Sequence, residues 1–129
     1  MLDTDTVSCA LRGAAGVGDR ILARRPSVLC ISSITLAELR FGAERRGSKK
    51  LHRLVDTFIE TVGVLPFDES AAACFGIVGA ALADAGTPIG QLDTLIAAHA
   101  VSQERVLVTN NARHFSKVRN LRTESWSTG

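Results

Sequence analysis

Short apolar runs alternate along this chain with longer segments of helical periodicity, and this alternation constrains the fold more than any other feature. Such runs lie at 28–32 (VLCIS), 64–67 (VLPF) and 106–109 (VLVT), and each precedes a segment with a helical pattern. Apolar runs of this length are typical of buried strands, and strands connected through helices pair in parallel. The order therefore predicts an α/β fold with a central parallel sheet of about four to five strands and helices on both faces.

The helical segments complete this prediction. Between 51 and 62, apolar side chains recur at the spacing of one helix face, which predicts an amphipathic helix. Between 71 and 82, small and apolar residues mark a long helix that ends at Gly86. No linker or repeat interrupts the 129 residues, so 1–129 is expected to form one domain. The remaining expected elements are a minimal strand at 1–3, a helix that stops near Gly13, a short helix around 17–24, helices over about 34–44 and 91–103, a short helix within 110–115 and a last strand within 121–125.

Charge is distributed unevenly, although the formal net charge is only +2. Residues 1–53 carry ten Lys or Arg against five acids, residues 54–104 carry seven acids and no Lys or Arg, and residues 105–129 carry five bases and one acid. If the fold brings the two ends together, this pattern places an acidic centre between basic surfaces. The scarcity of aromatic residues, with five Phe, one Trp and no Tyr, argues against a module that stacks RNA bases on an aromatic sheet.

The first residues and the cysteines bear on the compartment of the protein. The opening residues carry acids where a signal peptide needs bases, and no apolar run approaches about 18 residues. Cys9, Cys30 and Cys74 form no CxxC pair, which argues against a disulfide framework or a structural zinc site. We therefore expect a cytoplasmic protein without a membrane-spanning segment.

Three carboxylates stand where a buried core would favour apolar side chains. Asp3 ends the first strand, Glu38 lies on an apolar helix face, and Asp93 lies at the start of its helix. Because the carboxyl ends of parallel strands meet nearby helix N-termini at one edge, we expect the three to lie together, near the loop at 109–111. Clustered carboxylates repel, and oxygen donors without Cys or His favour Mg²⁺ or Mn²⁺.

Such a site suits the hydrolysis of a phosphodiester, because a metal ion can orient water and neutralise charge on the phosphate. A polyanionic substrate would be held by the basic residues Arg45, Arg46, Lys49, Lys50 and Arg53. Structural roles stay open for two of the acids, since Asp3 also fits a helix N-cap and Asp93 is favoured by the helix dipole. Glu38 has no such alternative, because a residue in the middle of a helix cannot cap it and its neighbours are apolar. His99 is expected to be a half-buried, hydrogen-bonded histidine and not a metal ligand.

An ordered set of motifs spans nearly the whole chain: LDTD at 2–5, CISSITLAELRFGAE at 30–44, GTPIGQLDTLIAAHA at 86–100, VTNNARHF at 108–115 and LRTESW at 121–126. With this order and spacing the chain resembles the PIN-domain ribonucleases, and specifically the VapC toxins of VapBC toxin–antitoxin modules. The resemblance implies a compact α/β/α sandwich, usually dimeric, in which Asp3, Glu38 and Asp93 correspond to the acidic, metal-binding and catalytic residues.

The resemblance also implies the activity and the partners. It implies a Mg²⁺-dependent endoribonuclease that cuts structured RNA and inhibits translation, neutralised by a small VapB antitoxin that occludes the site. The segments at 86–100 and 108–126 look most like a subgroup that cuts initiator tRNA in its anticodon stem-loop.

The chain departs from the family pattern at two positions. Asp5 stands where relatives commonly have Asn, which adds a carboxylate, and His114 stands where this subgroup commonly has Glu, so that a second metal ion loses a ligand. The first strand is also short for the family, which suggests that the biological start lies upstream of Met1. The auxiliary site residues are therefore Asp5, Asn110, Asn111 and His114, with Arg113 grouped among the RNA-binding residues.

Two other classes of protein fit parts of the sequence. LDTDTV is also similar to the nucleophile motif of haloacid-dehalogenase-type phosphatases, but that family needs an acidic pair near the C-terminus, and Glu124 is the only acid after residue 104. A non-enzymatic receiver domain would use Asp68 as its phosphate acceptor, which leaves Glu38 and the basic run at 45–53 without a role. We rank the nuclease first, the phosphatase second and the receiver third.

Overall fold

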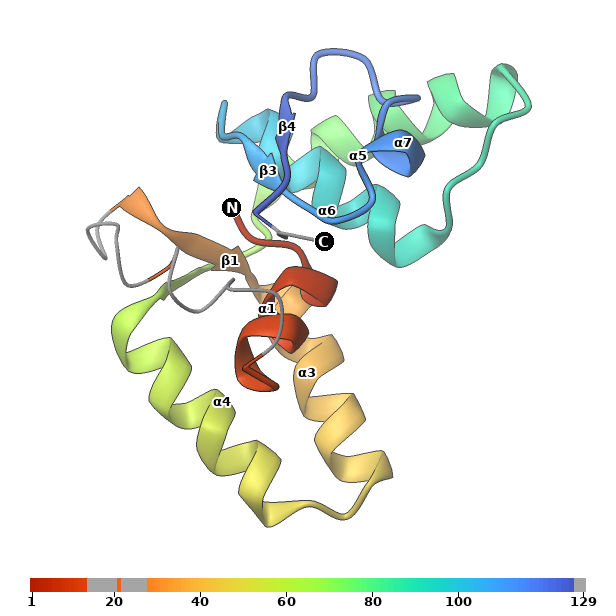
Figure 1. Cartoon of the computed structure of the whole chain (residues 1–129). Coiled ribbons are helices and arrows are strands. Elements are labelled where there is room, and N and C mark those ends of the chain that lie inside the picture. The colour runs from red at the N-terminus through yellow and green to blue at the C-terminus, as the bar shows by residue number, and fades with distance from the viewer. Residues whose placement is uncertain (14–20, 22–27, 127–129) are drawn as a thin grey trace.

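The computed structural model describes residues 1–13, 21 and 28–126, and its strands are separated along the chain by one or two helices (Figure 1). The expected short helix around 17–24 lies outside these residues, except for Ile21. The helices are α1 (Thr4–Leu11), α3 (Ser33–Arg45), α4 (Lys49–Thr61), α5 (Glu69–Asp84), α6 (Gln91–Ser102) and α7 (Ala112–Phe115), and the strands are β1 (Cys30–Ser32), β2 (Gly63–Leu65), β3 (Leu107–Val108) and β4 (Thr123–Glu124).

The strands form a parallel sheet whose centre is a single residue. β1 pairs in parallel with β2, and β3 pairs in parallel with β4. Leu2 joins the two ladders, because it forms parallel bridges to both Ile31 and Val108. Its N–H donates to Cys30 O at 2.9 Å, and the N–H of Asp3 donates to Val108 O at 3.0 Å. The minimal strand expected at 1–3 therefore lies in the middle of the sheet. Asp3 lies at the carboxyl end of this strand, between β1 and β3.

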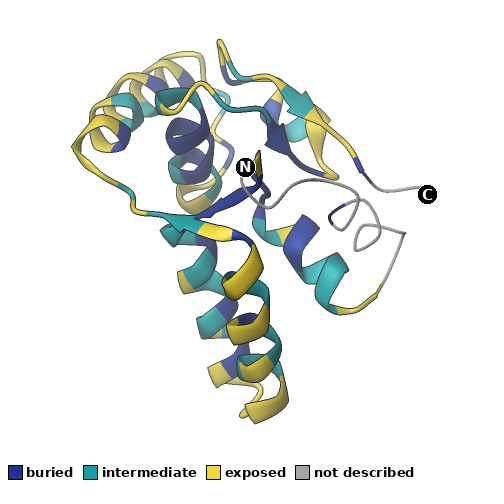
Figure 2. Ribbon diagram, turned by 90° about the vertical axis from the view of Figure 1, so that its left-hand side faces the viewer, coloured by how far each residue is buried: buried dark blue, intermediate teal, exposed yellow. Residues whose placement is uncertain are grey.

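Each face of the sheet has its own apolar core, as a sheet covered by helices on both sides requires. In each of three neighbouring pairs, one side chain packs in the first core and the next packs in the second. The first core receives Met1, Cys30 and Leu107, and the second receives Leu2, Ile31 and Val108. One core is completed by α1, α3 and α4, and the other by α5, α6 and α7. Figure 2 shows the buried residues along β1 and β3 and on the inner sides of the helices, whereas β2 and β4 are only partly covered. The predicted α/β/α arrangement is confirmed.

The ends of the helices have local causes that are visible in the sequence. Ser32, Ser48 and Asp68 accept hydrogen bonds from backbone N–H groups at the starts of α3, α4 and α5. Gly86 follows α5 with a φ of 69°, a left-handed conformation that glycine adopts without strain. None of the described helices is both long and apolar enough to cross a membrane.

Two local expectations need correction. The strand expected at 64–67 is β2 at Gly63–Leu65, because Pro66 has no N–H to donate and the N–H of Phe67 donates to Ser33 Oγ at 3.0 Å instead. His99 is fully buried rather than half-buried, and its Nδ1 lies 2.8 Å from Ser32 Oγ. Burial lowers the pKa of His99, so the ring favours its neutral form inside the protein.

Candidate active site

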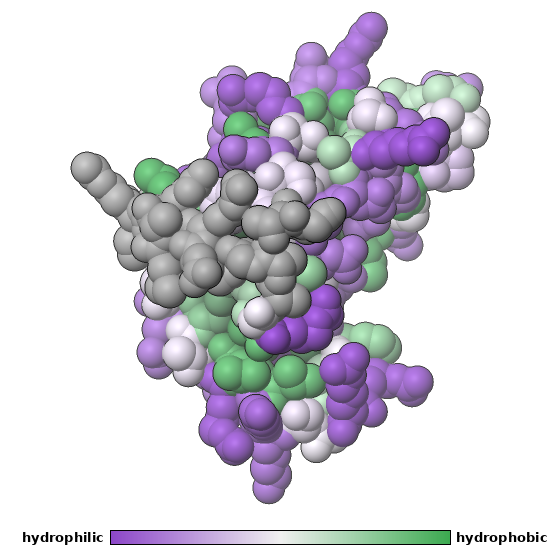
Figure 3. All heavy atoms as spheres, viewed as in Figure 1, coloured by the Kyte–Doolittle hydropathy of each residue, from purple (hydrophilic) through white to green (hydrophobic). Residues whose placement is uncertain are grey.

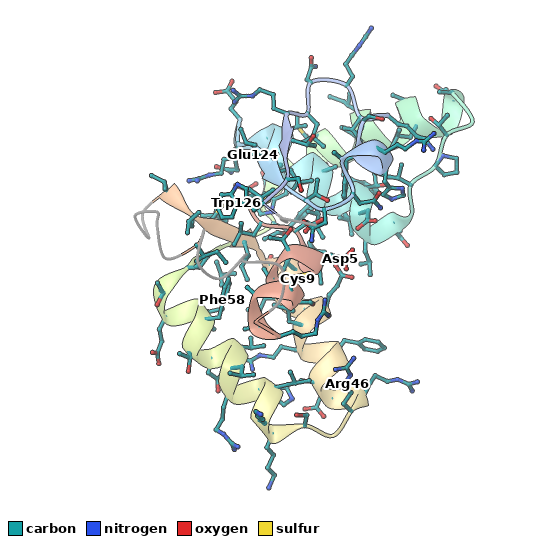
Figure 4. The ribbon with its side chains drawn as sticks, in the orientation of Figure 1. Asp5, Cys9, Arg46, Phe58, Glu124 and Trp126 are labelled. Carbon is teal, nitrogen blue, oxygen red and sulfur yellow. The ribbon has the colours of Figure 1, made fainter. Side chains whose placement is uncertain are left out.

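Four carboxylate side chains line one pocket of about 220 Å³ at the edge of the sheet where β1 and β3 end. Two come from the start of α1, one from the middle of α3 and one from the first turn of α6; they are Asp3, Asp5, Glu38 and Asp93. Thr4, Asn111 and Phe115 complete the lining. Figure 4 shows Asp5 on the opposite side of α1 from Phe58 and Trp126, which belong to an apolar core.

Asp3 is both a helix cap and a lining residue of the pocket. Its side chain is the N-cap of α1, with Oδ1 accepting the N–H of Thr6 at 2.9 Å, and it also lines the pocket. The residue is only 4% exposed, and this burial raises the pKa of its carboxyl. Hydrogen bonds from Thr109 and Thr6 lower the pKa, while the charge of Asp5 raises it. A carboxylate at this position is therefore costly to ionise without a compensating positive charge.

Glu38 is held from a different element. Thr4 Oγ1 donates to Glu38 Oε1 at 2.7 Å, which connects α1 to the middle of α3. Burial raises the pKa of Glu38 most, the hydrogen bond from Thr4 lowers it, and the charges of Asp93, Asp5 and Asp3 raise it further. The side chains thus lie close enough to repel one another, as the predicted clustering requires.

Asp93 has a histidine as its neighbour. His114 Nε2, from α7, lies 3.1 Å from Asp93 Oδ2 and 2.8 Å from the carbonyl oxygen of Ile89. The Asp93 side chain is 42% exposed, so it is far more accessible to solvent than the buried Asp3. His114 does not line the acidic pocket itself, but it reaches the pocket through this contact.

The two asparagines after β3 have different surroundings. Asn111 lines the pocket, and its N–H donates to Thr109 Oγ1 at 3.0 Å. Asn110 is not part of the lining, and its side-chain amide donates to Cys9 Sγ at 3.5 Å. The structure therefore brings Asn111, and not Asn110, to the acidic side chains.

The predicted RNA-binding residues are all exposed. Arg45, Arg46, Lys49, Lys50 and Arg53 lie at or near the turn between α3 and α4, and Arg113 lies on α7. Figure 3 shows hydrophilic side chains projecting from the lower end of the molecule, where α3 and α4 meet. We name the five residues on α3, α4 and their turn the basic tip.

A second cavity, of about 150 Å³, links the basic tip to the acidic pocket. It shares Thr4 and Glu38 with that pocket, extends between α1, α3 and α4, and includes Arg12 and Arg46. The sequence reasoning missed Arg12 and Thr4. Thr4, Ser8 and Arg12 recur every four residues along α1, and this spacing places them on one side of the helix.

The donor set fits a hard divalent cation, because the pocket offers carboxylate and amide oxygens and no sulfur. The side chains do not form a closed cage, however. Within the described part of the chain, no three His, Cys, Asp or Glu side chains are close enough as they stand to hold a metal ion. Binding an ion through several of these carboxylates would require side-chain movement within the pocket.

Comparison with known proteins places the chain in a nuclease family. The model of the PIN domain family matches residues 1–121, and the chain belongs to this family. It is 39% identical over 129 residues to a tRNA(fMet)-specific endonuclease VapC from Shigella flexneri, with 98% of this chain and 97% of the relative covered.

Solved structures agree with this assignment. The chain superposes on VapBC from Salmonella typhimurium, solved bound to DNA, with a TM-score of 0.87 and 40% identity over 98% of this chain and 96% of that one. For VapBC2 from Rickettsia felis, bound to a DNA fragment from its promoter, the TM-score is 0.89 with 30% identity over 98% of both chains. The resemblance to PIN-domain VapC proteins is confirmed, which favours the nuclease over the phosphatase and the receiver.

Proposed function

We propose that this protein is a metal-dependent endoribonuclease toxin of the VapC type, which inhibits translation by cutting structured RNA. One observation carries the proposal: Asp3, Glu38 and Asp93 converge in one pocket of a chain that belongs to the PIN domain family. The relative from Shigella flexneri is named for tRNA(fMet), so we propose initiator tRNA, cut in its anticodon stem-loop in the cytoplasm, as the substrate.

Asp3, Glu38 and Asp93 are the proposed catalytic residues and would hold Mg²⁺ or Mn²⁺, with Asp5 and Asn111 beside them. A bound ion would supply an oriented water molecule and positive charge at the phosphate. The carboxylates of Asp3 and Glu38 are held in place by Thr6 and Thr4 respectively. These hydrogen bonds restrict the two side chains and so limit the rearrangement they need in order to close around an ion.

RNA binding is proposed for the basic tip and Arg113. Their guanidinium and ammonium groups are exposed and can neutralise backbone phosphates, a contribution that is independent of sequence and sensitive to salt. Arg12 and Arg46, which line the cavity next to Glu38, extend positive charge toward the acidic pocket. A strand of RNA bound at the tip would therefore be directed toward the carboxylates.

The proposed protein partners are a VapB-type antitoxin and a second copy of the chain. The solved structures of similar chains are VapBC complexes, and a segment bound in the cavity between α1, α3 and α4 would cover Glu38. Co-purification of this chain with a co-expressed VapB-type antitoxin tests the first partner. Light scattering of the purified protein tests the homodimer.

The activity is tested by incubating purified protein with total tRNA in Mg²⁺ or in EDTA and mapping the cut ends. We expect one dominant cut that needs the metal and leaves a 5′-phosphate and a 3′-hydroxyl, because attack by water does not involve the ribose 2′-hydroxyl. Protein carrying Asp93→Asn serves as the control for contaminating nucleases. Cyclic phosphate ends, or cutting that continues undiminished in EDTA, would exclude this mechanism.

A further inference from the structure

His114 is held between two acceptors that come from a different part of the chain. Its Nε2 lies 2.8 Å from the carbonyl oxygen of Ile89, in the loop before α6, and 3.1 Å from Oδ2 of Asp93, in the first turn of α6. The imidazole ring is only partly exposed, and it packs edge-on against Phe115 with 5.4 Å between ring centroids. The ring therefore connects α7 to the start of α6 at the acidic pocket.

The Ile89 contact determines which nitrogen of His114 carries a proton. A carbonyl oxygen accepts hydrogen bonds and cannot donate them, so Nε2 must be the donor. The same N–H points toward Asp93 Oδ2, which makes a hydrogen bond shared between two acceptors. Both the neutral tautomer with this proton and the imidazolium ion satisfy the arrangement. As long as Nε2 donates this hydrogen bond, it has no lone pair to offer to a metal ion.

Each proposed metal ligand then has its own donor. The N–H of Thr6 donates to Asp3, the hydroxyl of Thr4 donates to Glu38, and the Nε2–H of His114 faces Asp93. Among residues 1–13, 21 and 28–126, His114 is the donor seen at the Asp93 carboxylate. Because this carboxylate is also partly exposed, it depends on His114 to keep its orientation.

We propose that His114 is a positioning residue, which orients the Asp93 carboxylate through Nε2–H and does not itself bind the metal. The inference rests on the proposed function, since it assigns Asp93 to a metal. Groups that orient a metal ligand typically contribute 10- to 100-fold to metal affinity or activity. The carbonyl oxygen of Ile89 accepts the same N–H and so keeps the imidazole ring facing Asp93.

The test compares two replacements for His114 by their affinity for Mn²⁺ alone, measured by electron paramagnetic resonance. His114→Gln keeps an N–H donor, whereas His114→Phe keeps a planar ring without one. We expect His114→Phe to weaken Mn²⁺ binding by about 10- to 100-fold and His114→Gln to stay within about threefold of the wild type. Thermal unfolding of both variants, without added metal, reports whether either has lost stability.

The control is His52→Phe. The His52 side chain has the same 28% exposure as that of His114, and it also contacts a carboxylate, Glu44, at 3.0 Å. It lies on α4 and outside the acidic pocket, so this variant should bind Mn²⁺ as the wild type does. A loss in the His52 variant equal to that of His114→Phe would mean that the effect is general and would overturn the inference.

Three further outcomes would overturn it. Equal affinity in His114→Phe and the wild type would show that the N–H is dispensable, and equal losses in both His114 variants would show that the ring matters and its donor does not. Nitrogen coupling to Mn²⁺ in pulsed spectra of the wild type, lost in His114→Gln, would make His114 a ligand. If the wild type binds Mn²⁺ and cuts RNA, and His114→Phe binds Mn²⁺ equally well, only this inference is rejected. If the wild type neither binds Mn²⁺ nor cuts RNA, the proposed function is rejected as well.

Discussion

The acidic pocket and the basic tip are built in opposite ways. The pocket collects carboxylates from positions 3, 5, 38 and 93, which belong to three helices, and it buries two of them far enough that desolvation raises the pKa of Asp3 and Glu38. The basic tip takes its charges from one stretch at 45–53, and all of them face solvent. Charges in the pocket are few, partly desolvated and interdependent, whereas those of the tip are screened by water and salt and act almost independently.

The comparison has a consequence for mutations. Removing one group from an interdependent site disables the whole site, since the remaining groups cannot do its work. Removing one charge from an exposed surface leaves the others unchanged, and effects accumulate only as several are removed.

The largest effect is expected from neutral replacements of the pocket carboxylates. Asp3→Asn, Glu38→Gln and Asp93→Asn should each reduce the cleavage rate by at least about 10²- to 10³-fold, the loss typical of removing one preorganised electrostatic group. Single-turnover cleavage of end-labelled tRNA measures the rate, and circular dichroism checks the fold. Asp84→Asn, at the exposed end of α5, is the matched control and should cut normally. Substantial activity in any of the three would remove that residue from the proposed site.

A smaller effect is expected on stability, and its sign follows from the raised pKa values. The ordinary pKa values are 3.8 for Asp3 and 4.5 for Glu38, and both carboxyls have higher values in the folded protein. Their contribution to stability is fully present below the ordinary values and is lost as pH rises through the raised ones. In EDTA, the melting temperature of the wild type should therefore fall relative to that of Glu38→Gln as pH rises from 4 to 8.

The difference should reach a few degrees at most, because Glu38 is only partly buried and solvent screens its interactions. Glu60→Gln, which neutralises an exposed acid on α4, corrects for the change in net charge. A gap between wild type and Glu38→Gln that stays constant with pH would show that the carboxylates do not interact as the pocket suggests.

The smallest effects of single substitutions are expected at the basic tip. Replacing Arg45, Arg46, Lys49 and Lys50 with Gln one at a time should weaken RNA binding only slightly, and replacing all four should weaken it strongly and flatten its dependence on salt. The position of the cut should not change, because the carboxylates remain in place. Filter binding over a range of salt concentrations measures the slope. Lys117→Gln with Arg119→Gln is the control, and an unchanged slope in the fourfold variant would assign the tip no role in RNA binding.

Much of the architecture could be predicted because its causes are local. The side chains between 51 and 62 repeat at helical spacing, and this pattern is realised as α4 at Lys49–Thr61. Ser48 and Asp68 cap helices through N–H groups a few residues away, and Gly86 ends one through its own backbone conformation. The alternation of strand and helix then leaves few arrangements other than a parallel sheet between two helical layers.

Within the candidate site, the amino-acid sequence determined which acids were available, and the motifs they belong to indicated that they act together. Only the tertiary structure decided what holds each of them. Thr4 is 34 residues from Glu38, and His114 is 21 residues from Asp93, yet each pair is in hydrogen-bond contact. Neighbouring Asn110 and Asn111 look equivalent in the sequence, and the turn after β3 sends only Asn111 to the pocket.

The physical reason is the range of the forces involved. Helix periodicity and capping depend on residues within about four positions, so they can be read from any short stretch of the chain. Contacts between distant residues depend on how the two apolar cores pack around Leu2, which joins Ile31 and Val108 in the middle of the sheet. Local patterns are therefore enough to predict the helices, the strands and the acids, whereas the packing of those elements decides which hydrogen-bond donor each acid meets.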